Sequence, residues 1–336
     1  MKTWHSEAKA DETPIISSRV RLARNIKKYP FLSRITPEQS KMMIRETTDR
    51  LSNHFEFIAF DQKSDAEKRF LLERHIISPE FLKITKPKGL LMQRDEKISI
   101  MINEEDHIRI QAICAGDDID SVWDTANKVD DLLEENTEYA FDKDYGYLTS
   151  CPTNTGTGLR ASFMVHLPML ERTGQFKSVL TAVSKFGMTI RGIYGEGSEP
   201  MGHIFQISNQ ITMGKSEEDI ISSLKRITSQ VIESETRFQE KALSERRIST
   251  ADRIYRSFGT LRYARSLSGK EAMEHLSSIR MGYMMKILDA PKPDLTLYQI
   301  MMDIQPGNLQ LIKGRELNEI ERDIARAEYL RGIFKD

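Results

Sequence analysis

The chain has 336 residues, of which 29% are Asp, Glu, Lys or Arg, and a formal net charge of −1 at pH 7. This balance argues against a general nucleic-acid or membrane-surface binder, because both need a clear excess of positive charge. No apolar run approaches the roughly 18 residues of a membrane span, and no hydrophobic signal region opens the chain. Two cysteines, Cys114 and Cys151, do not make a disulfide framework. We expect a soluble cytoplasmic protein with reduced thiols and about two domains.

The first elements along the chain follow from capping residues and periodicity. Residues 1–14 are polar, and we expect a loose segment there. A helix begins at Thr36-Pro37, because Thr36 can cap it and proline suits its first turn. Residues 119–138 repeat apolar side chains with helical period. Segments that alternate or are rich in β-forming residues predict strands at 97–103, 147–151, 160–166, 188–194 and 203–211.

The last third of the chain is predicted to be helical. Ser216 caps a long helix whose apolar seam recurs at a spacing of three to four residues, which is typical of packing rather than chemistry. From about Ser249 only helical patterns follow, so we place a domain boundary near 245–250. Helices and strands do not alternate strictly. We therefore predict an α+β fold, with a mostly antiparallel sheet flanked by helices over residues 15–247 and a small all-α domain over 248–336.

A dense polar cluster, Asn103-Glu104-Glu105-Asp106-His107-Ile108-Arg109, follows the first predicted strand. A rigid strand that ends in carboxylates suits a positively charged substrate. A solvated loop after a strand has the same composition, so the cluster alone leaves both interpretations open.

Several arginines lie in short segments flanked by serine or glycine rather than on a helical face. Arginine suits bidentate contact with phosphate, because its planar fork keeps its charge. A single such arginine is usually part of a surface salt bridge, whereas several that converge would clamp a polyphosphate. The candidates are Arg19, Arg21, Arg109, Arg160 and Arg191.

Four motifs occur in a fixed order along the chain: SSRVRLARN, NEEDHIRIQ, CPTN and RGIYGEGSE. Through them, roughly residues 15–245 resemble the phosphagen (guanidino) kinase family, and within it the bacterial kinases that act on protein arginine. Two departures from the small-substrate kinases point to that branch. The chain lacks their helical N-terminal domain, which implies an open cleft, and it carries a C-terminal extension of about ninety residues. The resemblance implies phosphorylation of exposed arginines in protein substrates, with ATP and Mg²⁺.

The resemblance also assigns roles to single residues. Glu105 and Glu196 would hold the substrate guanidinium and accept its proton, and Cys151 would be a reactive thiol beside it. The alternatives are a loop acid without a role at Glu196 and a merely packed cysteine at Cys151. His75 would lie against the adenine. No metal site made of protein side chains is expected, because Mg²⁺ would bridge the phosphates. The implied ATP site comprises Ser17, Ser18, Arg19, Val20, Arg21, His75, Arg109, Arg160, Ala161, Ser162, Phe163, Met164, Arg191, Gly192, Ile193, Tyr194 and Gly195.

Near the C-terminus, Arg322 and Arg326 are one helical turn apart, with Asp323 between them. Two arginines suit a phosphate and an aspartate suits a guanidinium, but spacing alone favours an ordinary solvated helix. The resemblance implies instead an allosteric phosphoarginine-binding motif, RDxxRA, formed by Arg322, Asp323, Arg326 and Ala327. It further implies a homodimer, an activator protein, Clp-type protease machinery as a partner, and a role in stress response and protein turnover.

Two other functions compete with this interpretation. The first is a kinase for a small free guanidino compound. The second is a non-catalytic adaptor that reads phosphoarginine, and the intact set of acids and arginines speaks against it.

Overall fold

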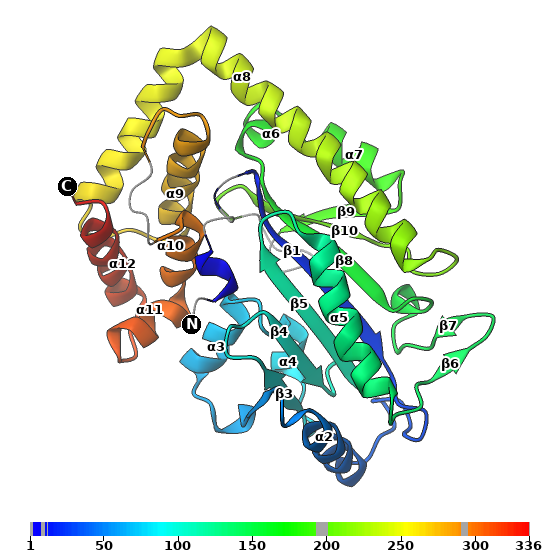
Figure 1. Ribbon diagram of the computed structural model, residues 1–336. Helices are drawn as coiled ribbons and strands as arrows, with labels where there is room; N and C mark the ends of the chain where they lie inside the picture. Colours follow the sequence, from blue (N-terminus) through cyan, green and yellow to red (C-terminus); the bar gives the residue numbers. More distant parts are fainter. Residues whose placement is uncertain (1–2, 8–10, 12, 193–200, 290–294, 336) are drawn as a thin grey trace.

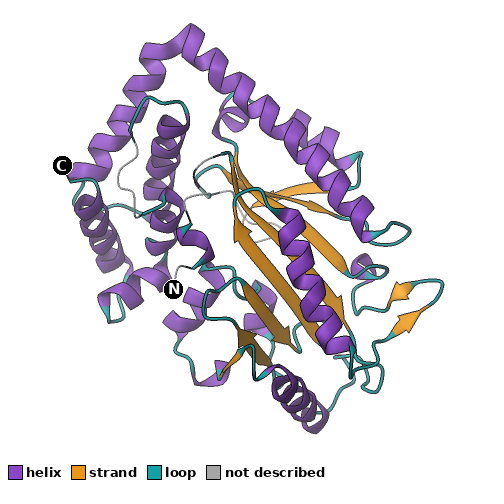
Figure 2. Ribbon diagram, viewed as in Figure 1, coloured by secondary structure: helices purple, strands orange, loops and turns teal. Residues whose placement is uncertain are grey.

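The computed structural model describes residues 3–7, 11, 13–192, 201–289 and 295–335. Within these ranges an eight-stranded antiparallel sheet is flanked by helices, and a helical region follows it (Figures 1 and 2). This arrangement confirms the predicted α+β fold. No helix in the described part of the chain has both the length and the apolar character needed to cross a bilayer.

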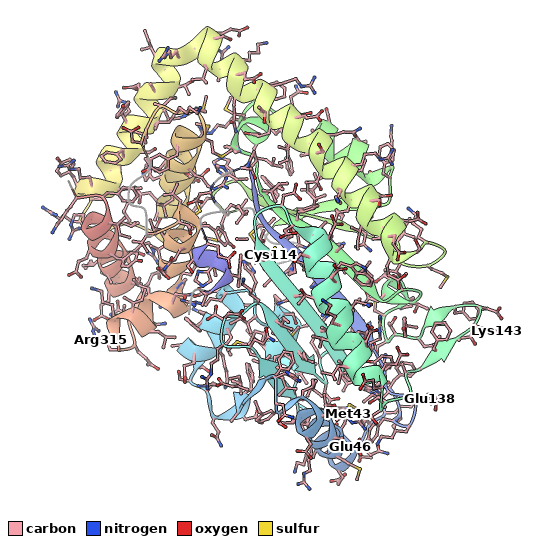
Figure 3. All side chains as sticks on the ribbon, in the orientation of Figure 1. Met43, Glu46, Cys114, Glu138, Lys143 and Arg315 are labelled. Carbon is pink, nitrogen blue, oxygen red and sulfur yellow. The ribbon has the colours of Figure 1, made fainter. Side chains whose placement is uncertain are left out.

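The sheet has the order β2-β3-β4-β5-β1-β8-β10-β9, and all its neighbouring strands are antiparallel. A separate hairpin, near Lys143 in Figure 3, is formed by β6 (Phe141–Asp142) and β7 (Gly146–Tyr147). The strands of the sheet are β1 (Ile15–Arg24), β2 (Glu56–Ile58), β3 (Gly89–Met92), β4 (Ile98–Ile102), β5 (Ile108–Ala115), β8 (Leu159–His166), β9 (Met188–Gly192) and β10 (Ile204–Asn209).

Most predicted strands are confirmed, but two differ. The predicted strand 147–151 is wrong beyond Tyr147, because the backbone N–H of Ser150 bonds the Asp106 carboxylate instead of a neighbouring strand. The predicted strand 188–194 is confirmed as far as Gly192, and its last two residues lie outside the described residues.

The helices include the predicted ones. Thr36 forms a capping box with Gln39, and the Ser216 side chain accepts a hydrogen bond from the N–H of Asp219. The helices are α2 (Pro37–Leu51), α3 (Asp65–Glu73), α4 (Pro79–Lys83), α5 (Ile119–Glu134), α6 (Pro168–Arg172), α7 (Phe176–Ser184), α8 (Glu217–Tyr263), α9 (Gly269–Met284), α10 (Leu297–Asp303), α11 (Pro306–Lys313) and α12 (Glu319–Ile333). Short 3₁₀ turns cover Trp4–Ser6, Phe60–Gln62 and Pro152–Asn154.

The long helix α8 joins the two parts of the molecule. Its first half lies along the sheet and its second half beside α9 and α12 (Figure 1). Arg246 interrupts the helix with φ −138° and ψ 33°. Ile220, Leu224 and Val231 on the first half belong to the core of the sheet, whereas Leu261 on the second half packs among the C-terminal helices.

The two faces of the sheet carry different side chains. Val20 and Leu22 of β1 point to the apolar core beneath α5 and α8, so Arg19 and Arg21 point to the opposite face. On that opposite face, Ile113 of β5 and its neighbours pack against the C-terminal helices at one end of the strands. The arginine-bearing part of the face therefore lies next to the C-terminal helices.

The expectation of a loose N-terminal segment is wrong for residues 3–6. Trp4 has no exposed surface, and its ring centroid lies 5.7 Å from that of Tyr298 on α10. The carbonyl oxygen of His5 accepts a hydrogen bond from the Thr296 hydroxyl. Burying an indole ring supplies enough apolar area to hold a short polar segment in place.

Candidate active site

Eight of the predicted site residues, among them all five arginines of the implied clamp, line one cavity of about 680 Å³ on the face of the sheet opposite α5 and α8. The segment from Leu72 to Lys83 forms one wall, and the strands form the floor. The predicted residues that line it are Arg19, Arg21, His75, Glu105, Arg109, Cys151, Arg160 and Arg191. The sequence separates these residues widely, and the order of the strands in the sheet brings them together.

The strand register explains how the arginines converge. Arg21 on β1 lies directly opposite Arg160 on β8, and Arg191 on β9 lies opposite Gln206 on β10. Like charges directly across a strand pair repel each other and destabilise the sheet. The Arg19 guanidinium donates to the Gln206 side chain at 2.5 Å, a neutral partner that leaves its charge uncancelled. A floor built this way favours a ligand with several negative charges.

Burial of these arginines strengthens the preference of the cavity for a negatively charged ligand. Burial, together with the charges of Arg109 and Arg160, lowers the pKa of Arg19 to about 10 against the opposing effect of Tyr298. The pKa of Arg21 is also lowered, by burial first and then by the charges of Arg19, Arg109 and Arg160. The Nε of Arg21 is buried without an acceptor among the described residues. A bound polyphosphate would relieve both the desolvation and the repulsion.

The three acids in the turn between β4 and β5, Glu104, Glu105 and Asp106, have different environments and partners. Glu104 is buried and binds the Arg109 guanidinium at 2.5 Å, and Ser78 donates to it. Burial alone would raise the pKa of Glu104, but Arg109 and Ser78 hold it below its ordinary value. Glu104 therefore orients Arg109 rather than facing a substrate.

Glu104 and Glu105 both line the cavity, but Glu105 is the one whose carboxylate is exposed there. Its side chain is 42% exposed, and its carboxylate lies 4.0 Å from the Arg109 guanidinium. Partial burial raises its pKa, and the neighbouring carboxylates of Asp106 and Glu104 raise it further against the opposing effect of Arg109. An accessible carboxylate with a raised pKa is suited to accept a proton near neutral pH.

Asp106 and His107 fasten the surrounding loops. The Asp106 carboxylate accepts from the Asn25 side chain at 2.7 Å and from the N–H of Ser150 at 2.6 Å. His107 bonds the carbonyl oxygen of Pro30 at 2.9 Å. The solvated-loop interpretation is therefore wrong for this cluster, because Asp106 and His107 are buried and bonded to two neighbouring loops.

Cys151 follows the loop held by Asp106. Its Sγ lies 3.0 Å from the Thr153 hydroxyl, and its carbonyl oxygen accepts from the Thr149 hydroxyl at 2.7 Å. The thiol lines the cavity, so the alternative of a cysteine that only fills the core is wrong. Cys114 lies on β5 with its side chain towards the opposite, core-facing side of the sheet (Figure 3).

His75 lines the cavity but is buried against the C-terminal region. Its Nε2 lies 3.0 Å from the Tyr298 hydroxyl, and its ring lies 6.3 Å from that of Trp4. Burial lowers its pKa to about 3, with the Arg19 charge adding to the effect. His75 is therefore neutral at physiological pH, and its contact with adenine stays a prediction.

Several residues of the implied ATP site do not line the cavity. Val20 and Phe163 point into the core beneath α5 and α8, and the Ser18 hydroxyl donates to the carbonyl oxygen of Gly116. Side-chain contact with a nucleotide is not supported for these strand residues, and their part in the site stays a prediction. The described residues of the implied ATP site that do not line the cavity are Ser17, Ser18, Val20, Ala161, Ser162, Phe163, Met164 and Gly192.

Four predicted residues, Ile193, Tyr194, Gly195 and Glu196, lie outside the described residues. Their roles stay predictions. Conversely, the sequence interpretation missed Gln206, Gln111 and Ser78, which the structure places in the cavity wall. Gln206 carried a usable signal, because a glutamine at an alternating position of an otherwise apolar strand marks the polar face.

The C-terminal motif is more enclosed than a solvated helix would be. Arg326 is 2% exposed, and it donates to the carbonyl oxygens of Ile304 at 3.1 Å and Leu267 at 2.7 Å. It also binds Asp323 at 2.5 Å, and Ala327 is buried. Arg322 is partly exposed and donates to the Leu317 carbonyl oxygen at 3.0 Å. The two arginines therefore differ, because Arg326 stabilises the fold whereas Arg322 retains exposed surface.

Comparison with known proteins decides the family. The sequence profile of the ATP:guanido phosphotransferase C-terminal catalytic domain matches residues 37–238. The chain belongs to this ATP:guanido phosphotransferase family. The profile described as the protein-arginine kinase McsB C-terminal domain matches residues 247–336. The chain is thus a kinase that uses ATP, and the identification made from the motifs is confirmed.

Relatives of the family cover nearly the whole chain. A protein-arginine kinase of Caldanaerobacter subterraneus is 45% identical over 95% of this chain and 96% of its own length. One of Bacillus subtilis is 41% identical over 98% and 93%. Among solved structures, a taurocyamine kinase of Schistosoma mansoni with bound transition-state analogue components has a TM-score of 0.61 at 26% identity, covering 68% of this chain and 34% of that chain. Lombricine kinase, at TM-score 0.60 and 22% identity over 72% of this chain and 70% of its own, shares the fold.

Replacing Cys151 by serine is expected to lower the rate of phosphorylation without abolishing it, because the thiol borders the cavity but is not its only polar group. Alkylating reagents should inhibit the wild-type kinase and leave the variant almost unaffected. Steady-state rates before and after alkylation measure both effects. Equal inhibition of the wild type and the variant would show that the reagents act at Cys114 or at nonspecific sites rather than at Cys151.

Proposed function

We propose that this kinase transfers the γ-phosphoryl group of ATP to arginine side chains of proteins. One observation carries the proposal: Glu105 lies on a wall shared by the arginine cavity and a second hollow of about 1040 Å³. One side of that wall is suited to a polyphosphate and the other to an acceptor. The names of the relatives support the choice of acceptor.

The second hollow, which we call the acceptor groove, is bordered by residues 30–34, 80–86 and 149–150. Its surface mixes apolar side chains such as Phe31 and Ile84 with charged ones such as Arg34 and Glu80. A stretch of polypeptide offers the same mixture. An arginine that projects from a protein would reach Glu105 from this side, which favours a protein over a small free guanidino compound.

The chemistry follows from the weak nucleophilicity of guanidinium, whose pKa lies near ~13 or above. The Glu105 carboxylate accepts a proton from one Nη of the acceptor arginine. That nitrogen forms a bond to the γ-phosphorus, while the bond to the bridging oxygen breaks and leaves its electron pair on ADP. Arg19, Arg21, Arg109, Arg160 and Arg191 neutralise the charge on the phosphates. Glu196 is proposed as the second carboxylate on the guanidinium.

Mg²⁺ is proposed to enter with the nucleotide. The described residues contain no group of three or more His, Cys, Asp or Glu side chains able to hold a metal. Glu104, the buried acid of the cavity, is committed to Arg109 and Ser78. The phosphate oxygens would therefore supply most ligands, and the ion would add charge neutralisation.

The test is incubation of the chain with ATP and an arginine-rich unfolded protein, followed by mass spectrometry near neutral pH because the N–P bond is acid-labile. Phosphoryl groups on arginine side chains are the expected result. Phosphorylation of free arginine or creatine alone would support the small-substrate alternative. Binding of phosphoarginine without any transfer would support the adaptor alternative.

The wider setting is proposed on the family resemblance. It comprises a homodimer, an activator protein, Clp-type protease machinery as a partner, and action in the cytoplasm during stress response and protein quality control. We also propose a catalytic domain up to residue 247 and a C-terminal domain from 248. The interruption of α8 at Arg246 and the profile boundary at 247 support this division.

Allosteric recognition of phosphoarginine is proposed at the motif formed by Arg322, Asp323, Arg326 and Ala327, in which Arg322 is the arginine with exposed surface. Replacing Arg322 by alanine should weaken binding of a phosphoarginine peptide about 10-fold or more, because a charged hydrogen bond contributes ~1.5–3 kcal/mol. Calorimetric titration measures the affinity. Arg315→Ala, which removes a 60% exposed arginine from the preceding connection (Figure 3), should change little.

The buried neighbour Arg326 is unsuitable for this test, because its removal leaves two carbonyl oxygens without a donor and would lower stability. Undiminished peptide affinity in a folded Arg322→Ala protein would show that phosphoarginine binds elsewhere, and a wild-type chain that binds no such peptide would rule out the site.

A further inference from the structure

Three consecutive residues at the end of α3, Glu73-Arg74-His75, each contact the C-terminal helices. We call them the α3 exit segment. His75 lines the arginine cavity, whereas its partners on α10 and α11 come more than 220 residues later in the chain, at sequence separations of 223 for His75 and 234 for Glu73. The segment therefore joins the cavity wall directly to the C-terminal region.

Glu73 makes the densest of these contacts. It is 5% exposed, and its carboxylate accepts from the N–H groups of Gly307 and Asn308 and from the Asn308 side-chain amide, all at 2.9 Å. These N–H groups open helix α11, which has no cap from its own N-cap residue, Gln305. Burial raises the pKa of Glu73, and the bonds to Gly307 and Asn308 oppose that rise.

The two helices approach too closely to slide past each other. A Cβ added at Gly307 would lie 2.6 Å from the backbone nitrogen of Phe70 and 2.9 Å from the Glu73 carboxylate. Only glycine fits there. A displacement of α11 must therefore move the end of α3 with it.

Arg74 and His75, the other two residues of the α3 exit segment, also contact the C-terminal helices. The Arg74 Nε donates to the Asn308 side-chain oxygen at 3.0 Å. His75 lies in the left-handed region with φ 59°, a conformation that costs energy for a non-glycine residue and persists only where its surroundings hold it. Those surroundings are the Tyr298 hydroxyl at 3.0 Å and the Gln111 amide, which donates to the His75 carbonyl oxygen at 2.6 Å.

The chain leaves His75 along the cavity wall and reaches the phosphate side within a few residues. Ile77 and Ser78 line the same cavity. The Ser78 hydroxyl bonds Glu104, and Glu104 binds Arg109. A continuous series of contacts thus runs from α11 through the α3 exit segment and Ser78 to Arg109.

We propose that the α3 exit segment sets the affinity of the cavity for ATP according to the position of the C-terminal helices, with Glu73 as the positioning residue. The inference rests on the proposed binding of ATP in this cavity. Glu73 touches no substrate. It fixes the end of α3, and thereby His75 and the wall that leads to Arg109.

The test compares Glu73→Gln, Asn308→Ala and the double variant in the full-length kinase. Both single changes should raise the dissociation constant of ATP about 5-fold or more, the lower range of a typical coupling between sites. The maximal rate at saturating ATP should change little. The loss in the double variant should be smaller than the sum of the two single losses, because both changes weaken the same contact between Glu73 and α11. Asp65→Asn, an exposed acid at the other end of α3, is the matched control and should leave ATP affinity unchanged.

Folded variants with unchanged ATP affinity but a lower melting temperature would overturn the inference, because Glu73 would then only stabilise local packing. If Glu73→Gln does not fold, Tyr298→Phe decides the question, since it removes one hydroxyl and keeps the ring beside Trp4. An unchanged ATP affinity in that variant overturns the inference, and a raised dissociation constant supports it. A wild-type chain that does not bind ATP would instead overturn the proposed function.

Discussion

Replacing Glu105 by glutamine is expected to reduce phosphorylation by ~10²–10⁴-fold, the usual loss when a general base is removed. Glutamine keeps the size of the side chain but cannot accept the proton. Glu105 is partly exposed, and its ion pair with Arg109 is long, at 4.0 Å. The fold and the ATP affinity should therefore remain close to those of the wild type. Single-turnover transfer to a protein substrate measures the effect.

A matched control is Glu138→Gln, which changes a 73% exposed acid that does not line the cavity and is labelled in Figure 3. The raised pKa of Glu105 adds a pH signature. Because the base must be ionised, the rate should rise with pH through a midpoint above the ordinary glutamate value. A Glu105→Gln enzyme with near-wild-type turnover would remove this residue from the chemistry.

Replacing Arg21 by lysine is expected to lower kcat/KM for ATP about 10- to 100-fold, the loss of roughly one charged hydrogen bond worth ~1.5–3 kcal/mol. Lysine offers a point charge instead of a planar fork. In addition, the burial and neighbouring charges that lower the pKa of Arg21 would act more strongly on an ammonium group and favour its neutral form. Initial rates over a range of ATP concentrations test the change.

Arg45→Lys on the exposed side of α2 serves as the control and should leave ATP kinetics unchanged. An Arg21→Lys enzyme with the same ATP dependence as the wild type would show that the Arg21 guanidinium is not needed to bind the ATP phosphates. Without ATP, the melting temperature of the Arg21→Lys variant should be equal to or higher than that of the wild type. The reason is that the change removes one of the two guanidinium groups, Arg21 and Arg160, that face and repel each other across the strands.

The sequence predicted the parts of this protein that depend on local patterns. Periodicity and capping residues located the helix after Thr36, the long helix after Ser216 and most central strands. The motif resemblance singled out Glu105 and the five arginines that line the cavity. The polar cluster alone did not reveal which of its three acids is left exposed to the cavity, because that depends on the partners that Glu104 and Asp106 find.

Long-range contacts account for the main errors. Trp4 belongs to a polar segment, and it is buried by residues distant in the sequence such as Tyr298, almost three hundred residues later. Arg326 similarly resembled a surface residue, although its acceptors are carbonyl oxygens of two other segments. Neither partner can be read from sequence spacing, since each is defined by the packing of the C-terminal helices.

The separation of 234 residues between Glu73 and Gly307 has a consequence for synthesis of the protein. At ~5–20 residues per second, a ribosome takes on the order of tens of seconds between these two positions. During that interval the carboxylate of Glu73 has no helix α11 to bind, and His75 has no Tyr298. The nascent chain can assemble its strands and bring its arginines together, but it completes the wall of the cavity only after its last helices emerge.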